Sequence, residues 1–207
     1  ERLAPVLTLL RRAATMKDCV FEHDYARPQL DWLLPELAGL RKAAVLLAFD
    51  ARACALQYRT QEAVADLVAI RGIARHMRAN SPLLIGWLVA CAIEATHVQA
   101  LGNVLVTAQI GAADLAPLLD EDPATYQKGL LRALRMEEAF GLSAGATLGE
   151  GDDPQLAGEV GPGAEWVLPL WRVFLLRDDL RSYRRLMSRC HEIGPKPYAE
   201  SATAWKE

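Results

Sequence analysis

Residues 81–111 read SPLLIGWLVACAIEATHVQALGNVLVTAQIG, an almost uncharged stretch. It carries one ionisable acid, Glu94, and no lysine or arginine occurs between Arg78 and Lys128. Its longest uninterrupted apolar run, 82–93, has twelve residues, whereas a membrane-spanning helix needs about 20. Polar side chains interrupt the remainder. The stretch therefore predicts a central core helix, packed on all sides, rather than a transmembrane span.

The composition favours a globular all-α protein. Apolar residues make up 52% and charged residues 24% of 207 residues, which is enough chain for a sizeable core. Strand-like alternation is almost absent. The net charge of -3 argues against a nucleic-acid binder. The four cysteines form no CxxC pair, which excludes a zinc ribbon or a thioredoxin motif. Three lie in predicted helices, where we expect buried free thiols; the alternative, if the protein is exported, is disulfides. We expect no cofactor.

Two long helices precede the central one. Apolar spacing predicts a helix from Trp32 to Tyr58 and another, capped by Thr60, to about Ala79. The short connection makes them antiparallel neighbours. Ser81 and Pro82 are expected to start the central helix. The second helix has a predicted inward face of Ala63, Leu67, Ile70, Ala74 and Met77. Its predicted solvated side consists of Glu62, Asp66, Arg71, Arg75 and Arg78.

An internal repeat marks helix starts. Residues 1–14, ERLAPVLTLLRRAA, and 31–44, DWLLPELAGLRKAA, are identical at seven of fourteen positions. Shorter echoes follow at 115–119 and 165–171. Proline fits a first helical turn, and an acid before it caps that turn. The pattern predicts recurrent helix N-termini, as in a helical-hairpin array, and the alternative is independent use of the same capping chemistry.

The last third of the chain changes character. Seven of the 23 residues at 141–163 are glycine, and the only charges there are acidic, so composition predicts a loop. A basic helix is expected from about 165 to 192, with six arginines against two aspartates between Arg172 and Arg189. That helix is expected to lie against the acidic loop, or to meet an acidic partner or anionic lipid headgroups. An extended tail follows.

Glu94 and His97 form the clearest candidate site. A Glu-x-x-His places both side chains on one helix face, as in di-iron four-helix proteins. Such a site needs a second Glu-x-x-His, and the sequence contains none. The favoured interpretation is a buried polar pair, in which the two side chains bind each other or an arginine of a neighbouring helix. We therefore predict no metal ligand here.

Two weaker constellations remain. Glu137 and Glu138 are adjacent on a helix and point in different directions, so one is expected to pair inward while the other is solvated. The segment from Cys19 to Tyr25 combines a thiol, His23 and two acids, but a packed interhelical turn anchored by Phe21 and Tyr25 is favoured over a Cys–His dyad. Phosphate-binding glycine loops, GxSxG and HExxH do not occur.

The runs HDYARPQLDWLLPELAGLRKAAVLLAFDARACAL and EAVADLVAIRGIARHMRANSPLLIGWLVACAIEA resemble a group of uncharacterised bacterial helical proteins. That group has an LxxLRxLA helix, then A…DL…RLARHL, then PLLIxxLVxxAI and later LRALRxER. The last motif reads LRALRMEE at 131–138, with glutamate in place of arginine. The resemblance covers roughly residues 17–140 and implies hairpin-built helices without a known activity. Many members carry an N-terminal membrane anchor, which implies an exported or anchored periplasmic domain; the alternative is cytoplasmic.

Taken together, these patterns predict one all-α domain over 1–207 with about seven or eight helices in stacked antiparallel hairpins. The expected function is a non-catalytic binding or scaffold module for a protein or peptide. The alternative is a helical protein, either an enzyme or a non-catalytic binder, that holds a small ligand or a metal at an internal polar site near Glu94 and His97. Membrane contact would use an upstream anchor or the basic last helix. The candidate binding residues are Glu94, His97, Arg181, Arg184 and Arg185.

Overall fold

The structure is a computed structural model of the chain, and it describes residues 3–23, 34–119, 124–150 and 164–204. Within those ranges the chain forms nine α-helices, one short 3-10 helix and no strand, which confirms the predicted all-α class. The backbone divides into two compact units, Glu1–Glu22 with Leu33–Gly129, and His23–Trp32 with Leu130–Glu207. We describe each unit by itself, and the single domain over 1–207 stays a prediction.

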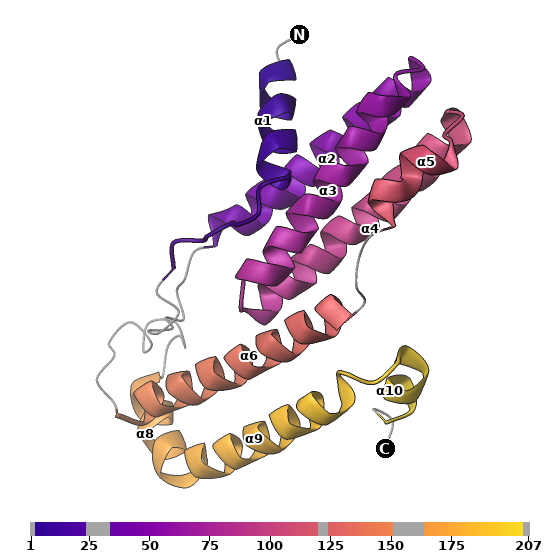
Figure 1. The fold of residues 1–207 in the computed structure, drawn as a ribbon. Helices are drawn as coiled ribbons and strands as arrows, with labels where there is room; N and C mark the ends of the chain where they lie inside the picture. The colour runs from indigo at the N-terminus through magenta and orange to yellow at the C-terminus, as the bar shows by residue number, and fades with distance from the viewer. Residues whose placement is uncertain (1–2, 24–33, 120–123, 151–163, 205–207) are drawn as a thin grey trace. The chain divides into compact units, whose positions relative to one another are not determined.

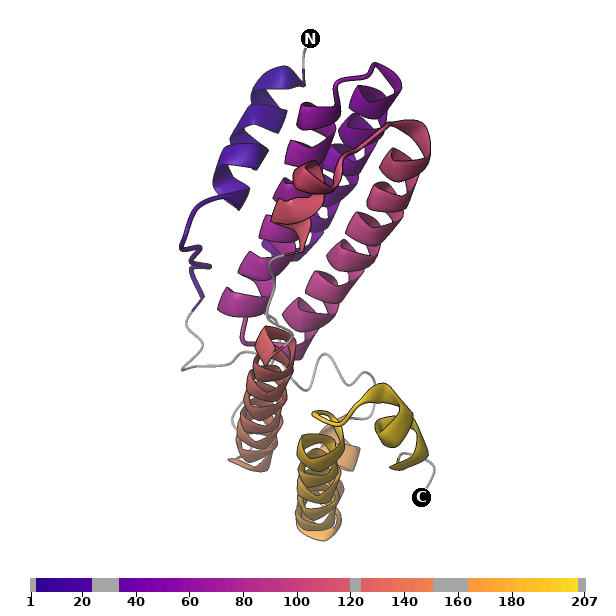
Figure 2. The ribbon, with the colours of Figure 1, turned by 45° about the vertical axis from the view of Figure 1, so that its right-hand side comes forward.

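The first unit is a bundle in which α2, α3 and α4 lie side by side and α1 packs on α3 (Figures 1 and 2). Its helices are α1 (Ala4–Ala14), α2 (Pro35–Leu56), α3 (Thr60–Asn80), α4 (Leu84–Thr107), α5 (Ala112–Leu115) and η1 (Ala116–Leu118), followed by the first turn of α6 (Ala124–Glu150). The three residues between α2 and α3 bring these helices together as the predicted antiparallel pair.

Helix α3 forms the centre of this unit. All five residues of its predicted inward face, Ala63, Leu67, Ile70, Ala74 and Met77, are buried. The predicted solvated side is wrong at two positions, because Asp66 and Arg78 are also buried, at 0% and 4% exposure. Each of them pairs with an oppositely charged side chain of another helix. Arg59, rather than Thr60, occupies the N-cap position and makes no side-chain capping bond.

The prediction that residues 81–111 form a core helix packed on all sides is wrong, because α4 is exposed along one side. It buries one stripe, consisting of Gly86, Ala90, Ile93, His97, Ala100 and Val104. These residues are spaced alternately four and three positions apart, as expected for a helix that lies against α2 and α3 on one side only. The helix also begins later than predicted, at Leu84, and Ser81 instead follows the end of α3.

The repeated prolines mark helix starts at three of their four occurrences. Pro5 and Pro35 lie in the first turns of α1 and α2, and Pro117 lies in the first turn of η1. Pro169 instead lies inside α8 (Ala164–Phe174). The two acidic caps predicted by the repeat, at positions 1 and 31, lie outside the described residues.

The second unit contains most of α6, with α8, α9 (Leu176–Ile193) and α10 (Tyr198–Ala204). The predicted loop at 141–163 is wrong in its first part, because α6 continues to Glu150; residues 151–163 lie outside the described residues. The glycines serve helix packing. A β-carbon at Gly141 would lie 2.3 Å from the Tyr183 hydroxyl, and one at Gly145 would lie 2.5 Å from Leu180.

The predicted basic helix at 165–192 is two helices, because the chain turns at Leu175 between α8 and α9. The expected extended tail contains a third, α10. Helix α9 lies along α6, where the Tyr183 hydroxyl donates to the Glu137 carbonyl oxygen at 2.7 Å. His191 Nε2 lies 2.9 Å from Glu138 Oε2. The inward pairing predicted for one of the two adjacent glutamates therefore involves Glu138.

Candidate functional site

Glu94 forms an ion pair with Arg78, which α3 supplies from its last turn. The Arg78 side chain is 4% exposed and that of Glu94 is 20% exposed. The Arg78 guanidinium also lies over the ring of Tyr126, 4.0 Å from its centroid. The predicted pairing of Glu94 with an arginine of a neighbouring helix is confirmed. Neither Arg78 nor Tyr126 was singled out by the sequence as part of this cluster.

His97 lies one turn beyond Glu94 on the buried stripe of α4 and is 7% exposed. A metal site would require further ligands around this pair. Within the described part of the chain, the one group of three potential metal ligands is Asp50, Cys54 and Asp66, and it includes neither Glu94 nor His97. The pairing of Glu94 with Arg78 further favours a structural role for the Glu-x-x-His motif.

Asp50 and Asp66 share the guanidinium of Arg11, which arrives from α1. Arg11 Nε lies 2.6 Å from Asp66 Oδ1, and a terminal guanidinium nitrogen lies 2.7 Å from Asp50 Oδ2. Burial raises the pKa of Asp66 to about 6, although the hydrogen bond from Arg11 opposes this. Burial also raises the pKa of the Cys54 thiol to about 11. The Cys54 thiol stays protonated, and the Arg11 guanidinium already supplies the positive charge that a metal ion would bring to the two carboxylates. These groups therefore favour a structural ion-pair cluster over a metal site.

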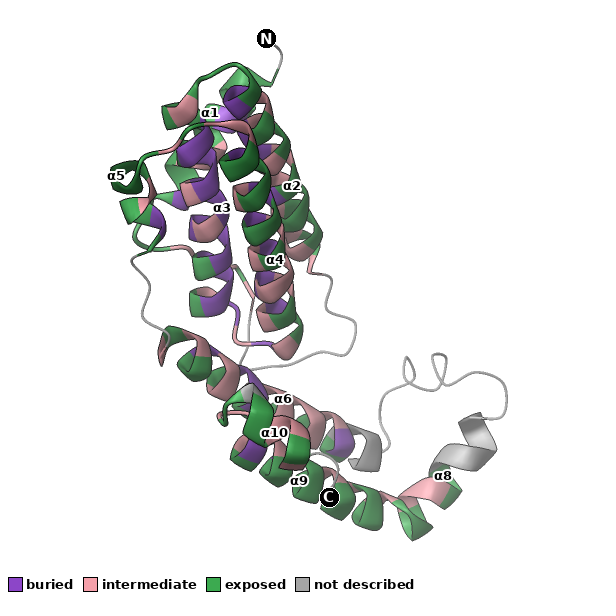
Figure 3. Cartoon of the chain, turned by 90° about the vertical axis from the view of Figure 1, so that its right-hand side faces the viewer, coloured by how far each residue is buried: buried purple, intermediate pink, exposed green. Residues whose placement is uncertain are grey.

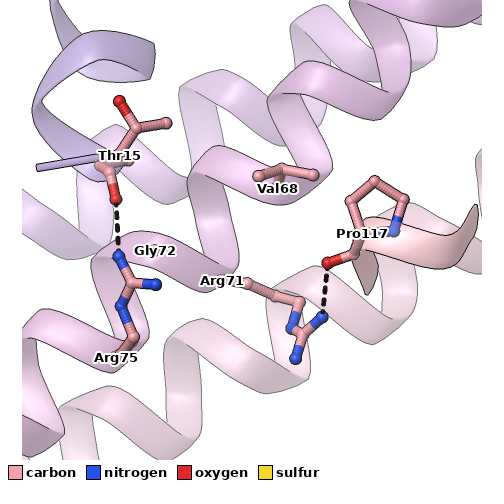
Figure 4. A pocket seen from close by; sticks show the side chains of 7 residues that line it. Thr15, Val68, Arg71, Gly72, Arg75 and Pro117 are labelled. Atoms are coloured by element: carbon pink, nitrogen blue, oxygen red, sulfur yellow. Dashed lines mark hydrogen bonds between the residues drawn. The ribbon is translucent and has the colours of Figure 1, made fainter. Parts of the chain in front are cut away.

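A small open pocket lies where the end of α1 meets α3 and η1 (Figure 4). Its volume is about 220 Å³, and its lining includes Arg71, Gly72 and Arg75. Arg71 donates to the Pro117 carbonyl oxygen at 3.3 Å, and Arg75 donates to the Ala14 carbonyl oxygen at 3.2 Å. The arginines thus satisfy backbone carbonyl groups and hold neighbouring elements, so we assign this pocket a structural role.

The remaining predicted binding residues lie in the second unit. Arg181, Arg184 and Arg185 are exposed on α9, and Arg181 pairs with Asp178 of the preceding turn at 3.0 Å. They belong to a surface, whereas Glu94 and His97 belong to the interior of the first unit.

The cysteine-containing segment after α1 does not have the properties of a nucleophilic site. Burial raises the pKa of the Cys19 thiol, whereas an activated cysteine has a lowered pKa. Phe21 packs against the core of the first unit, as predicted, and Tyr25 lies outside the described residues. All four cysteines are free thiols, but only Cys54 is buried, so the expected burial is wrong for Cys91 and Cys190.

The surface that the sequence did not predict is the outer face of α4. We use this name for Ile85, Leu88, Val98, Leu105 and Val106, which are between 45% and 90% exposed. Exposed residues extend along α4 in Figure 3. Only 28% of the most apolar window of this helix is buried, and the helix is long and apolar enough to cross a bilayer by length and composition alone. The outer face carries no charged side chain.

No family model, curated protein or solved structure matches this chain.

Proposed function

We propose that this chain is a non-catalytic protein-binding module and that the outer face of α4 is its binding surface. One observation carries the proposal: the most apolar helix of the chain leaves a long, uncharged apolar face exposed to solvent. Contiguous exposed apolar surface is unfavourable in water and is typical of interaction sites. The polar clusters of the first unit are occupied by internal ion pairs, so they offer less to a ligand.

The shape of this surface suits an amphipathic helix. The 24 residues of α4 correspond to about 36 Å of helix. Side chains at 85, 88, 98, 105 and 106 are distributed over most of this length. A partner helix with apolar residues spaced by three and four would pack along them, as two helices pack side by side. Gln99 and Asn103, which are exposed on the same helix, would supply polar contacts that fix the register.

A protein partner fits this surface better than a bilayer around α4 does. Helix α4 packs along α2 and α3, so a membrane-spanning α4 would take its neighbours into the hydrocarbon layer. Those neighbours carry exposed charges, including Arg41, Lys42 and Arg52 of α2. Charged side chains inside a bilayer are costly. Covering α4 with a protein helix satisfies its apolar face and leaves these charges in water.

Site-specific photo-cross-linking in the native host tests this proposal. A photoreactive amino acid is placed at Val98 or Val106, and matched controls carry it at Lys42 or Arg52 of α2. We expect a discrete cross-linked protein from the α4 positions only, and its loss when Leu105→Asp is added. Cross-links that are equal at all four positions, that contain only lipid, or that join two copies of this chain would each contradict the proposed partner.

The alternative function is a small-ligand or metal-binding site around Glu94 and His97. The observation that favours it is the burial of two basic side chains, His97 and Arg78, close to Glu94. Iron, zinc and manganese would be measured per chain in protein purified without chelator. A stoichiometric metal that is lost in His97→Ala would support this alternative, and substoichiometric metal unchanged by His97→Ala would reject it.

A further inference from the structure

A second exposed apolar surface lies where α8 turns into α9. Leu170, Val173, Phe174 and Leu175 are 61%, 75%, 70% and 54% exposed, and we call these four residues the α8–α9 corner. These four large apolar side chains fall within six consecutive positions of the chain. They are distinct from the outer face of α4, which belongs to the first unit.

The corner is held in a defined shape. The Trp171 indole nitrogen donates to Asp179 Oδ2 at 2.6 Å, which ties the last turn of α8 to the first turn of α9. The Leu175 amide donates to the Trp171 carbonyl oxygen at 2.8 Å, and the Asp179 amide donates to the Leu175 carbonyl oxygen at 2.9 Å. These bonds fix the backbone while the apolar side chains remain exposed. The patch is therefore preorganised for contact with another apolar phase.

Arginines follow the corner along α9. Arg177, Arg181, Arg184 and Arg185 are exposed, and we call them the α9 arginine face. Their spacing of four, three and one places them on one side of the helix. The two nearby acids are already engaged, since Asp178 pairs with Arg181 and Asp179 accepts from Trp171. Helix α9 also contacts α6 through Tyr183 and His191, and the four arginines stay exposed beside that contact.

We infer that the α8–α9 corner and the α9 arginine face together bind the surface of an anionic lipid bilayer. The corner would enter the boundary between headgroups and acyl chains, where exposed apolar side chains leave water. The arginines would contact the phosphate groups of anionic lipids, which their guanidinium groups can bind through two parallel hydrogen bonds. This binding is peripheral and does not require any helix to span the membrane.

The combination of apolar and basic groups favours a lipid surface over an acidic protein. An acidic protein would satisfy the arginines but would leave the corner in water. A bilayer surface presents anionic headgroups and an apolar layer within a few ångströms of each other. From Leu175 to Arg185 the helix rises by about 15 Å. With α9 lying along the membrane surface, all four arginines stay near headgroup depth when the corner inserts.

Sedimentation with vesicles tests the inference on the full chain. The vesicles contain phosphatidylcholine alone or with about 30% phosphatidylserine, which is an anionic lipid. We expect binding to the anionic vesicles only, weakened by salt. Arg181→Glu, Arg184→Glu and Arg185→Glu combined should lower the partition coefficient about a hundredfold. Val173→Ser with Phe174→Ser should lower it about tenfold.

Matched variants separate this site from general charge and hydrophobicity. Arg12→Glu, Arg41→Glu and Lys42→Glu change three exposed cations of the first unit, and Phe49→Ser in α2 removes an apolar side chain that is 68% exposed. Both controls should bind as the parent chain does, and circular dichroism should show unchanged helicity in every variant. Equal binding to neutral vesicles, or unchanged binding of the arginine variant, overturns the inference. If the arginine variant loses vesicle binding but the corner variant does not, the corner does not insert and that part of the inference is overturned. Binding to soluble polyaspartate but not to vesicles would overturn the lipid partner and indicate an acidic protein instead.

Discussion

Arg11 and Asp66 are separated by 55 positions in the chain, yet Nε of the arginine lies 2.6 Å from Oδ1 of the aspartate. The same guanidinium also binds Asp50, so one cation from α1 holds two carboxylates of α2 and α3. The Asp66 carboxylate is completely buried, and its second oxygen has no hydrogen-bond partner within the described structure. This arrangement ties α1 to the bundle and makes its stability sensitive to the protonation of Asp66.

We predict that protonation of Asp66 stabilises the fold. Burial raises its pKa to about 6, whereas an unfolded aspartate has a pKa near 3.9. Between these values the folded state binds more protons than the unfolded state, so the free energy of unfolding rises as the pH falls from about 6 to about 4. The gain from this one group is on the order of 2 to 3 kcal/mol. The relevant neighbours are Arg11 on α1 and Asp50 and Cys54 on α2.

The Asp66→Asn variant isolates this contribution. The amide oxygen can still accept the hydrogen bond from Arg11, but it does not ionise. Urea unfolding of both proteins between pH 4 and 7 should show a difference in stability that changes across this range and favours the variant at pH 7. A constant difference over the whole range would contradict the raised pKa of Asp66.

Gly72 allows α1 to approach α3, and we predict that Gly72→Ala destabilises the chain. A β-carbon at this position would lie 2.3 Å from the Ala14 carbonyl oxygen, which is backbone and cannot rotate away. We expect a loss of about 2 kcal/mol in the free energy of unfolding. Gly39→Ala in α2 is the matched control, because a β-carbon there has no neighbour within 4 Å. That substitution should stabilise the helix by about 0.5 to 1 kcal/mol in the same urea titration.

Helix positions and the inward face of α3 could be predicted because they follow from local rules. The apolar residues of α3 are spaced three and four positions apart, and this spacing alone identifies the buried side of the helix. Prolines at positions 5 and 35 mark the starts of α1 and α2 because proline fits a first turn. Neither feature depends on which helix lies opposite.

The cluster of Arg11, Asp50 and Asp66 depends on tertiary partners and was therefore missed. Asp66 lies three residues after Ala63 and four before Ile70, so its spacing places it at the border of the buried stripe. A charged residue there is buried only if a partner such as Arg11 arrives from elsewhere. The outer face of α4 was missed for a different reason: both sides of that helix are apolar, so spacing cannot identify the exposed one.

Tyr58 occupies a conformation that favours glycine, and we predict that Tyr58→Gly stabilises the chain. Its φ angle is 60°, in the left-handed region, and it directly follows the C-cap residue of α2. The side chain is 88% exposed, so little packing is lost. Relief of strain should outweigh the greater freedom of the unfolded chain by about 0.5 to 1 kcal/mol. The neighbouring Gln57→Gly, where φ is -97°, should instead destabilise, and a gain in both variants would contradict a role for the backbone conformation.

The buried pair of Arg78 and Glu94 should be costly to break but replaceable as a unit. Glu94→Leu leaves the Arg78 charge buried against Tyr126 without its carboxylate, and we expect a loss of about 3 kcal/mol. Combining it with Arg78→Met removes the buried charge as well and should restore stability to within about 1 kcal/mol of the parent chain. Urea unfolding of the parent, the two single variants and the double variant gives the coupling energy.

The exposed pair of Arg59 and Glu62 supplies the control for this cycle. Its two side chains are 43% and 47% exposed at a distance of 2.7 Å, so Glu62→Leu should change stability by less than about 0.5 kcal/mol. A coupling energy between Arg78 and Glu94 as small as that of the exposed pair would mean that water reaches both groups. The α3–α4 contact would then depend on apolar packing alone, and Glu94 would be available to a ligand, which would favour the alternative function at Glu94 and His97.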